Sequence, residues 1–159
     1  MTYYETNPKR RAFLGHLSFG VRDMSISKPF YIAIFEPFGI GLVYDDGVGG
    51  CTGYGVGDWE WINLFRVKPL SNSSPASGGE SAQREELERL GSGRGTHIAF
   101  NAPSREAVDG FYKAALENGG RGDGAPGVRK DVHKNYYACY VYDPDGHRLE
   151  AVYQESVKQ

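Results

Sequence analysis

The stretch Gly15-His16-Leu17-Ser18-Phe19 decides the fold of this chain, because a second version of it follows 81 residues later. The second version reads Thr96-His97-Ile98-Ala99-Phe100. Two further pairs share the offset without a gap, namely Phe30-Tyr31 with Phe111-Tyr112 and Gly39 with Gly120. These three matching stretches at one offset predict two copies of one structural module of roughly 60 residues.

The second copy indicates the order of elements within a module most clearly. Residues 96–101 alternate in polarity, as a half-buried strand does. Ser104 is placed to cap a helix whose apolar residues recur at helical spacing, and Asn118-Gly119-Gly120 is placed to end it. The remaining elements are strand 136–142, the turn Asp143-Pro-Asp-Gly146 and the returning strand 147–153. The predicted order is strand, helix, loop or short strand, strand, turn, strand.

The first copy follows the same order. A strand over 13–22 precedes a helix over 27–38, which begins at Ser27 because Pro29 is tolerated only in the first turn of a helix. Strands are predicted over 40–44, 51–56 and 59–67. The chain is therefore predicted to be one domain over 1–159, with βαβββ modules at 13–67 and 95–154. Residues 68–94 form a linker rich in Ser and Gly, with a short surface helix at 81–90.

Composition excludes several classes of function. The chain has 159 residues and a formal charge of −2, which argues against a nucleic-acid-binding domain. No apolar run is long enough to span a membrane, and the N-terminus lacks the apolar core of a secretory signal. Only two cysteines occur, so we expect a reducing, cytoplasmic location. The 22 glycines and 13% aromatic residues are typical of many short strands and turns, often around a cavity.

The repeated histidines lie on one face of their strands. Alternation places His16 and Ser18 opposite Leu17 and Phe19, whose apolar side chains point towards the helices. His97 occupies the equivalent position in the second copy. If the two modules pair about a pseudo-twofold axis, their first strands meet near that axis and the two histidines converge.

Glu150 is the natural third member of this group. It lies within the last predicted strand, on the opposite face from Leu149 and Ala151. A buried carboxylate needs a partner, which is either an arginine or a metal ion. Two histidines and a carboxylate that leave open positions suit Fe(II), Mn, Ni or Zn. We therefore predict His16, His97 and Glu150 as metal ligands, although a single strand histidine is more often just a hydrogen-bonded polar residue.

The other polar candidates are less constrained. The repeat predicts a counterpart of Glu150 on the last strand of the first copy, where Glu60 and Asn63 are both candidates for a fourth ligand. Glu60 is better explained as a structural or exposed residue, and Trp61 of the same strand is a candidate to line the substrate cavity. His147 follows a turn and is predicted to be exposed, whereas His133 lies in a loop at the edge of the pocket.

The motifs together resemble the vicinal oxygen chelate superfamily of glyoxalases, bleomycin and fosfomycin resistance proteins and extradiol dioxygenases, and in particular its uncharacterised glyoxalase-like branch. The resemblance runs over about 13–153. It is carried by Leu14-Gly-His-Leu-Ser-Phe-Gly-Val-Arg-Asp23, Gly95-Thr-His-Ile-Ala-Phe100, Gly124-Ala-Pro-Gly-Val-Arg129, Asn135-Tyr-Tyr137 and Asp143-Pro-Asp-Gly146 with Leu149-Glu-Ala-Val152. It implies an α+β fold in which two βαβββ modules pair into a curved, half-open mixed sheet around a cavity.

The resemblance also implies a function. It implies a divalent metal on His16, His97 and Glu150, and a small-molecule substrate that reaches Arg129 and Tyr137. The leading hypothesis is a glyoxalase-like lyase or isomerase, in which the metal acts as a Lewis acid on vicinal oxygens and Glu150 moves a proton. The alternatives are an Fe(II) extradiol-type dioxygenase and a metal-free small-molecule (drug) binding protein. The modules pair either within one chain or across a homodimer, and we expect no nucleic acid or membrane partner.

Overall fold

The computed structural model of the chain describes residues 15–57, 59–67, 96–130, 132 and 135–154. The predicted linker, its helix at 81–90 and His133 lie outside these residues. The first module comprises β1 (Leu17–Val21), α2 (Met24–Phe35), the 3₁₀ turn η1 (Glu36–Phe38), β2 (Gly41–Asp45), β3 (Cys51–Val56) and β4 (Trp59–Arg66). The second comprises β5 (Ile98–Asn101), α4 (Arg105–Glu117), β6 (Arg121–Val128), β7 (Tyr136–Tyr142) and β8 (Arg148–Gln154).

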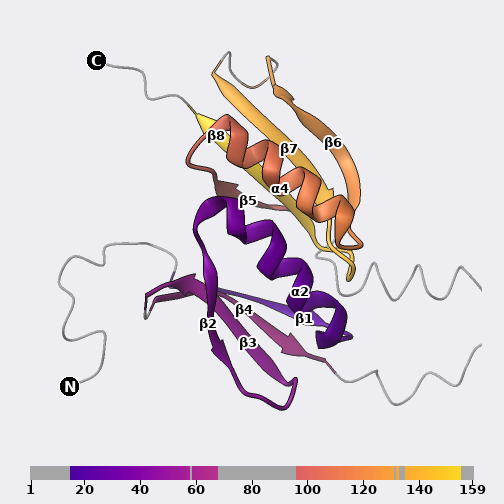
Figure 1. Cartoon of the computed structure of the whole chain (residues 1–159). Helices are drawn as coiled ribbons and strands as arrows, with labels where there is room; N and C mark the ends of the chain where they lie inside the picture. The colour runs from indigo at the N-terminus through magenta and orange to yellow at the C-terminus, as the bar shows by residue number, and fades with distance from the viewer. Residues whose placement is uncertain (1–14, 58, 68–95, 131, 133–134, 155–159) are drawn as a thin grey trace, which may run out of the picture.

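Each module has one helix and one four-stranded mixed sheet, so the predicted α+β fold of two βαβββ modules is confirmed. The strand orders are β1-β4-β3-β2 and β5-β8-β7-β6, and in both sheets the first strand runs parallel to the last. Both sheets are unclosed. The strands β1 and β5, which carry the repeated motif, are edge strands of their own sheets. Figure 1 shows the modules one above the other, with α2 and α4 adjacent between them.

The helix α2 begins earlier than the sequence predicts. Asp23 caps it, because its carboxylate accepts a hydrogen bond from Ser25 N at 2.9 Å, and Pro29 lies inside the helix. The predicted start at Ser27 is therefore wrong. Pro29 removes the helical hydrogen bond to the Ser25 carbonyl, but Ser25 is exposed, so water can take the place of the missing donor.

The second module follows the prediction more closely. Ser104 caps α4 through a hydrogen bond from Ala107 N of 3.2 Å, and the chain turns after the helix at Gly119, with φ of 92°. The segment predicted as a loop or short strand is the eight-residue strand β6. It pairs irregularly with β7 at the edge of the sheet, where glycines and Pro126 are tolerated.

The core lies between the helices and the sheets. Phe19 is 8% exposed, and Phe100 packs against Phe35 and Phe111 with ring centroids 5.2 and 6.4 Å apart. The apolar residues of β1 and β5 thus point towards the helices, as alternation predicts. The opposite face of each sheet carries the histidines; we call it the open face.

The two modules are joined by a buried polar junction at the turn after β7. Tyr31 donates from its hydroxyl to Asp143 Oδ2 at 2.7 Å, and Ser27 donates to Asp145 Oδ2 at 2.6 Å. Arg22 donates to Asp145 Oδ1 from its backbone N at 3.0 Å and from Nε at 3.1 Å. The turn of the second module is therefore bonded directly to β1 and α2 of the first.

His147 belongs to this junction. It is only 6% exposed, its Nε2 lies 2.8 Å from the carbonyl oxygen of Gly20, and its ring lies 5.0 Å from that of Phe19. The prediction that His147 is exposed is wrong. A residue next to a turn reaches solvent only when the turn ends at the surface of the whole molecule, and this turn ends against the first module. No helix in the described residues is long and apolar enough to cross a membrane.

Candidate functional site

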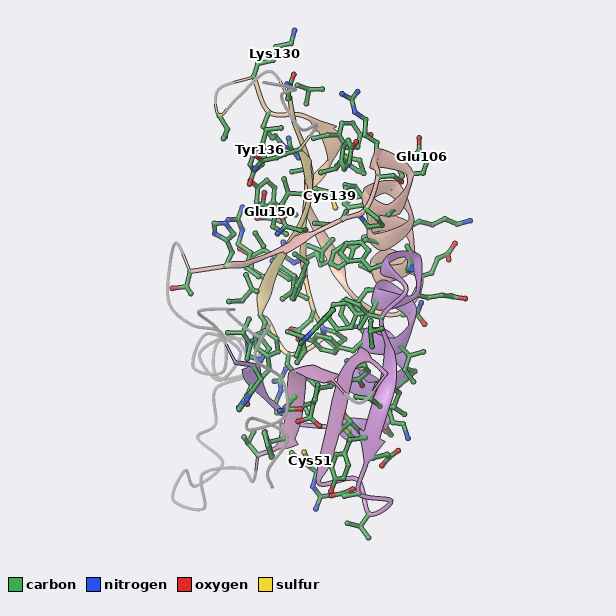
Figure 2. All side chains as sticks on the ribbon, turned by 90° about the vertical axis from the view of Figure 1, so that its left-hand side faces the viewer. Cys51, Glu106, Lys130, Tyr136, Cys139 and Glu150 are labelled. Atoms are coloured by element: carbon green, nitrogen blue, oxygen red, sulfur yellow. The ribbon has the colours of Figure 1, made fainter. Side chains whose placement is uncertain are left out.

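The open face of the second module holds a carboxylate surrounded by donors. Glu150 on β8 pairs with Ala99 on β5 and with Tyr140 on β7, so it is central in its sheet. The residue is only 1% exposed. In Figure 2, Glu150 and Tyr136 lie on one side of this sheet, and Glu106 of α4 lies on the other. The carboxylate therefore stands on the face away from the helix.

Both oxygens of Glu150 are engaged. The Tyr136 hydroxyl donates to Oε1 at 2.6 Å, and His97 Nε2 lies 3.0 Å from Oε2. Tyr140 is the cross-strand neighbour of Glu150, and its ring meets that of His97 edge-on with centroids 5.9 Å apart. The predicted pair His97 and Glu150 is thus brought into contact from neighbouring parallel strands.

The hydroxyl groups of Tyr136 and Tyr140 stay protonated beside this carboxylate. Burial, and then the hydrogen bond to Glu150, raises the pKa of Tyr136 well above its usual value. The pKa of Tyr140 is raised by burial and by the Glu150 charge. A phenol that stays protonated fixes the carboxylate oxygens in place, as outer hydrogen bonds commonly do for metal ligands.

His16 is not part of this group within one chain. Among the described residues, no three His, Cys, Asp or Glu side chains lie close enough together to hold a metal ion. His16 precedes β1, which is the edge strand of the other sheet and pairs only with β4. A single chain therefore presents His97 with Glu150 on one open face and His16 on another.

The strand register identifies the counterpart of Glu150 in the first module. Ser18 pairs with Asn63 between β1 and β4 as Ala99 pairs with Glu150 between β5 and β8. Of the two candidates left open by the sequence, Asn63 rather than Glu60 thus occupies the equivalent position. Asn63 is 5% exposed, and its Oδ1 has no hydrogen-bond partner in the described part of the chain.

Glu60 reaches the same open face by an irregularity. The pairing of β3 with β4 shifts by one residue between Tyr54 and Gly55, so that Gly55 faces Glu60. Without the shift, alternation would place Glu60 on the opposite face from Asn63. Instead its carboxylate stands over Gly53, where an added Cβ would lie 2.7 Å from Glu60 Cδ.

The predicted substrate residues are distributed over both modules. Trp61 on β4 is 40% exposed. The Arg129 guanidinium lies over the Tyr140 ring, 5.3 Å from its centroid, and donates from Nη2 to the carbonyls of Ala125 and Ala138. Arg129 is thus held close to the Glu150 group from the β6–β7 side of the sheet.

Tyr137 points the other way. Its hydroxyl donates to Asp109 Oδ1 of α4 at 2.8 Å, on the helix side of the sheet. The tyrosines on the Glu150 side are Tyr136 and Tyr140, and the sequence analysis missed the bond from Tyr136 to Glu150. Alternation along 136–142 separates the two sets, but only the register of β7 with β8 shows which set faces Glu150.

The chain as a whole is similar to a large group of known proteins. Residues 13–151 match the Glyoxalase/Bleomycin resistance protein/Dioxygenase superfamily. The chain belongs to this superfamily, which is the group that the motifs resemble.

Individual relatives cover most of the chain. The metallothiol transferase FosB of Shouchella clausii (strain KSM-K16) is 29% identical over 137 residues, which cover 86% of this chain and 77% of the relative. The structure of a glyoxalase/bleomycin resistance protein from Albidiferax ferrireducens T118 is 26% identical, with a TM-score of 0.67 over 90% of this chain and all 100% of that chain. The fosfomycin resistance protein FosX from Mesorhizobium loti, at 19% identity, has the same fold, with a TM-score of 0.54 over 91% of this chain and 92% of that chain.

Proposed function

We propose that the protein is a metal-dependent, glyoxalase-like enzyme that acts on a small substrate with vicinal oxygens. The observation that carries the proposal is the contact between His97 Nε2 and Glu150 Oε2, 3.0 Å apart on an open sheet face. An imidazole nitrogen beside a carboxylate, with outer hydrogen bonds already made, is a donor pair that suits Zn, Ni, Mn or Fe(II).

The third ligand is His16 of a second copy of the chain. Two copies that place β1 of one beside β5 of the other bring the two open faces together, and each shared site then holds His16, His97 and Glu150. The edge position of both strands supports this arrangement, because each has a side that no other described strand pairs with. It also accounts for the separation of His16 from the other two residues within one chain.

The residues of the chain have distinct roles in this proposal. The bound metal supplies Lewis-acid charge that stabilises an enolate or oxyanion. Glu150 takes a proton from the carbon next to the coordinated oxygen and returns it to the neighbouring carbon. Tyr136 holds the carboxylate, while Arg129 and Trp61 contact the substrate.

The first experiment is elemental analysis of metal in untagged wild-type protein and in the variants His16→Ala, His97→Ala and Glu150→Ala. We expect near-stoichiometric metal in the wild type and loss of it in each variant. Glu117→Ala is the control, because its exposed carboxylate on α4 lies on the helix side. If the wild type stays metal-free after reloading with Fe(II), Mn, Ni and Zn, the proposal fails and a metal-free binding protein takes its place.

Mixing variants tests the shared site. His16→Ala and Glu150→Ala chains, unfolded and refolded together, form mixed dimers in which one of the two sites keeps all its ligands. We expect roughly a quarter of the wild-type metal to return, because half of randomly paired dimers are mixed. No recovery in the mixture would place all ligands on one chain.

Turnover then distinguishes the reaction class. A glyoxalase-like enzyme converts an α-ketoaldehyde–thiol adduct, whereas uptake of oxygen with a catechol would indicate the dioxygenase reaction. The name of the FosB relative adds thiol transfer, which is followed as loss of a free thiol. Each assay is run with the metal found by elemental analysis and repeated with Glu150→Ala.

A further inference from the structure

The open face of the first module carries a group of residues that the metal proposal does not use. They are Glu60, Trp61 and Asn63 of β4, which we call the acceptor niche. The pairing shift beside Glu60 brings its carboxylate onto the face of Asn63. Bulges of this kind re-aim side chains, and they are common next to binding sites.

The niche places two oxygen acceptors side by side. The Glu60 carboxylate fills the space that a side chain at Gly53 would take, and Gly53 is the cross-strand partner of Asn63. Directly opposed side chains in antiparallel strands have Cβ atoms about 5 Å apart, so one ligand group can reach both oxygens.

Neither acceptor is satisfied within the described part of the chain. Asn63 is 5% exposed and its buried Oδ1 lacks a donor, while Glu60 makes no hydrogen bond or ion pair there. A buried acceptor without a donor destabilises a protein, so a ligand that supplies a donor would be favoured there. Burial, and then the charges of Glu60 and Asp46, raise the pKa of Cys51 in the neighbouring strand.

Trp61 adds an aromatic surface. It is two residues from Asn63, so alternation places both on the same face, and it is 40% exposed. An indole that lies open beside a carboxylate suits a cation, since its π face attracts positive charge.

We propose that the acceptor niche binds the protonated amine of a small molecule. An ammonium group has three N–H donors and one positive charge, which match the carboxylate, the amide oxygen and the indole. A divalent metal fits less well, because two fixed oxygens are too few for a hard cation, and no three His, Cys, Asp or Glu side chains of the described residues come together to hold one.

The niche lies within one module and needs neither a metal nor a second chain. The protonated amine is a feature of the ligand that the proposed metal-dependent function does not specify. Where the two open faces meet, the amine end of a substrate is held by Glu60 and Asn63 of one chain, and its oxygens face His97 and Glu150 of the other. The inferred substrate class is an amine-bearing oxygenated small molecule.

The test uses the full-length, ¹⁵N-labelled chain after treatment with a chelator. Benzylammonium is titrated while the backbone amide signals of 60–63 are followed. Benzyltrimethylammonium has the charge and the ring without N–H donors, and benzyl alcohol has the ring without the charge. We expect saturable shifts with benzylammonium, and at least about tenfold weaker binding in Glu60→Gln and Asn63→Leu. The control Glu117→Gln binds like the wild type.

Several outcomes would overturn the inference. They are no saturation in the wild type, equal binding of the trimethylated probe, or unchanged binding in Glu60→Gln. Saturation of the same amides by Zn²⁺, without a response to benzylammonium, would make the niche a metal site. Glu150→Ala separates the two proposals, because it removes the proposed metal site and leaves benzylammonium binding intact.

Discussion

The two open faces share one strand register but differ in how their central polar residue is satisfied. Glu150 receives a hydrogen bond from Tyr136, lies beside Tyr140 and touches His97. Its counterpart Asn63 has an oxygen without a donor in the described residues. The difference arises at the neighbouring strand, where Tyr140 stands beside Glu150 and Gly53 stands beside Asn63. One repeated framework thus supports a preorganised carboxylate in one module and an unfilled acceptor pair in the other.

The largest expected effect is a loss of metal affinity at the Glu150 carboxylate of the second module. Tyr136→Phe removes the donor to Glu150 Oε1, and we expect metal affinity to fall by about 10- to 100-fold, as for other outer partners of metal ligands. Competition with a chelator of known affinity measures it. Tyr142→Phe is the matched control on the same strand and face, since the Tyr142 ring lies under Arg121 rather than at Glu150. Equal losses in both variants would show that Tyr136 does not orient the carboxylate.

At Asn63, removal of the polar group is expected to stabilise the protein. Asn63→Leu replaces an amide whose oxygen is buried and unpaired by an apolar side chain of similar size. We expect the free energy of unfolding to rise by about 1 kcal/mol, because the desolvation cost of the unpaired oxygen disappears. Urea denaturation of metal-free protein measures it. A loss of stability would mean that Asn63 already has a donor, such as an ordered water, in the folded protein.

The junction between the modules has a pH dependence of its own. Burial raises the pKa of Asp143 above the value of 3.8 that it has when unfolded, against the opposing effects of His147 and of the Tyr31 hydrogen bond. The charge of Asp145 raises the pKa of Asp143 further. The native state therefore binds this proton more tightly, and the contribution of Asp143 to stability falls as pH rises from about 4 through the native pKa.

Asp143→Asn tests this effect, because the amide has nearly the shape of the carboxyl group but does not titrate. Stability is measured by urea denaturation at several pH values. We expect the wild type to lose stability relative to the variant as pH rises through this range. Parallel stability curves for the two proteins would contradict the prediction.

The smallest expected effect is a difference in the reactivity of the two thiols, Cys51 and Cys139. Cys139 is fully buried and its pKa is raised to about 12, whereas Cys51 is partly exposed on the first module. We expect only Cys51 to react with an aromatic disulfide in the native protein, and both thiols after unfolding. Glu60→Gln should speed the reaction of Cys51, because the Glu60 charge contributes to its raised pKa. An unchanged rate would place Glu60 farther from Cys51 than the structure does.

The sequence by itself determined the repeat, the order of elements and the faces of the strands. The spacing of His16 and His97 and the helical periodicity after Ser104 depend only on local geometry, which a single sequence records. Local rules failed where a residue was considered without its surroundings. Pro29 lies inside α2, where the exposure of Ser25 lets water replace the missing donor, and His147 is covered by the first module.

Only the tertiary structure decided which residues meet. The choice of Asn63 over Glu60 as the counterpart of Glu150 rests on the pairing of β1 with β4, and the re-aiming of Glu60 rests on a one-residue shift against β3. The bond of Tyr136 to Glu150 depends in the same way on the register of β7 with β8. Pairing between strands is set by contacts distant in sequence, so no local pattern specifies it.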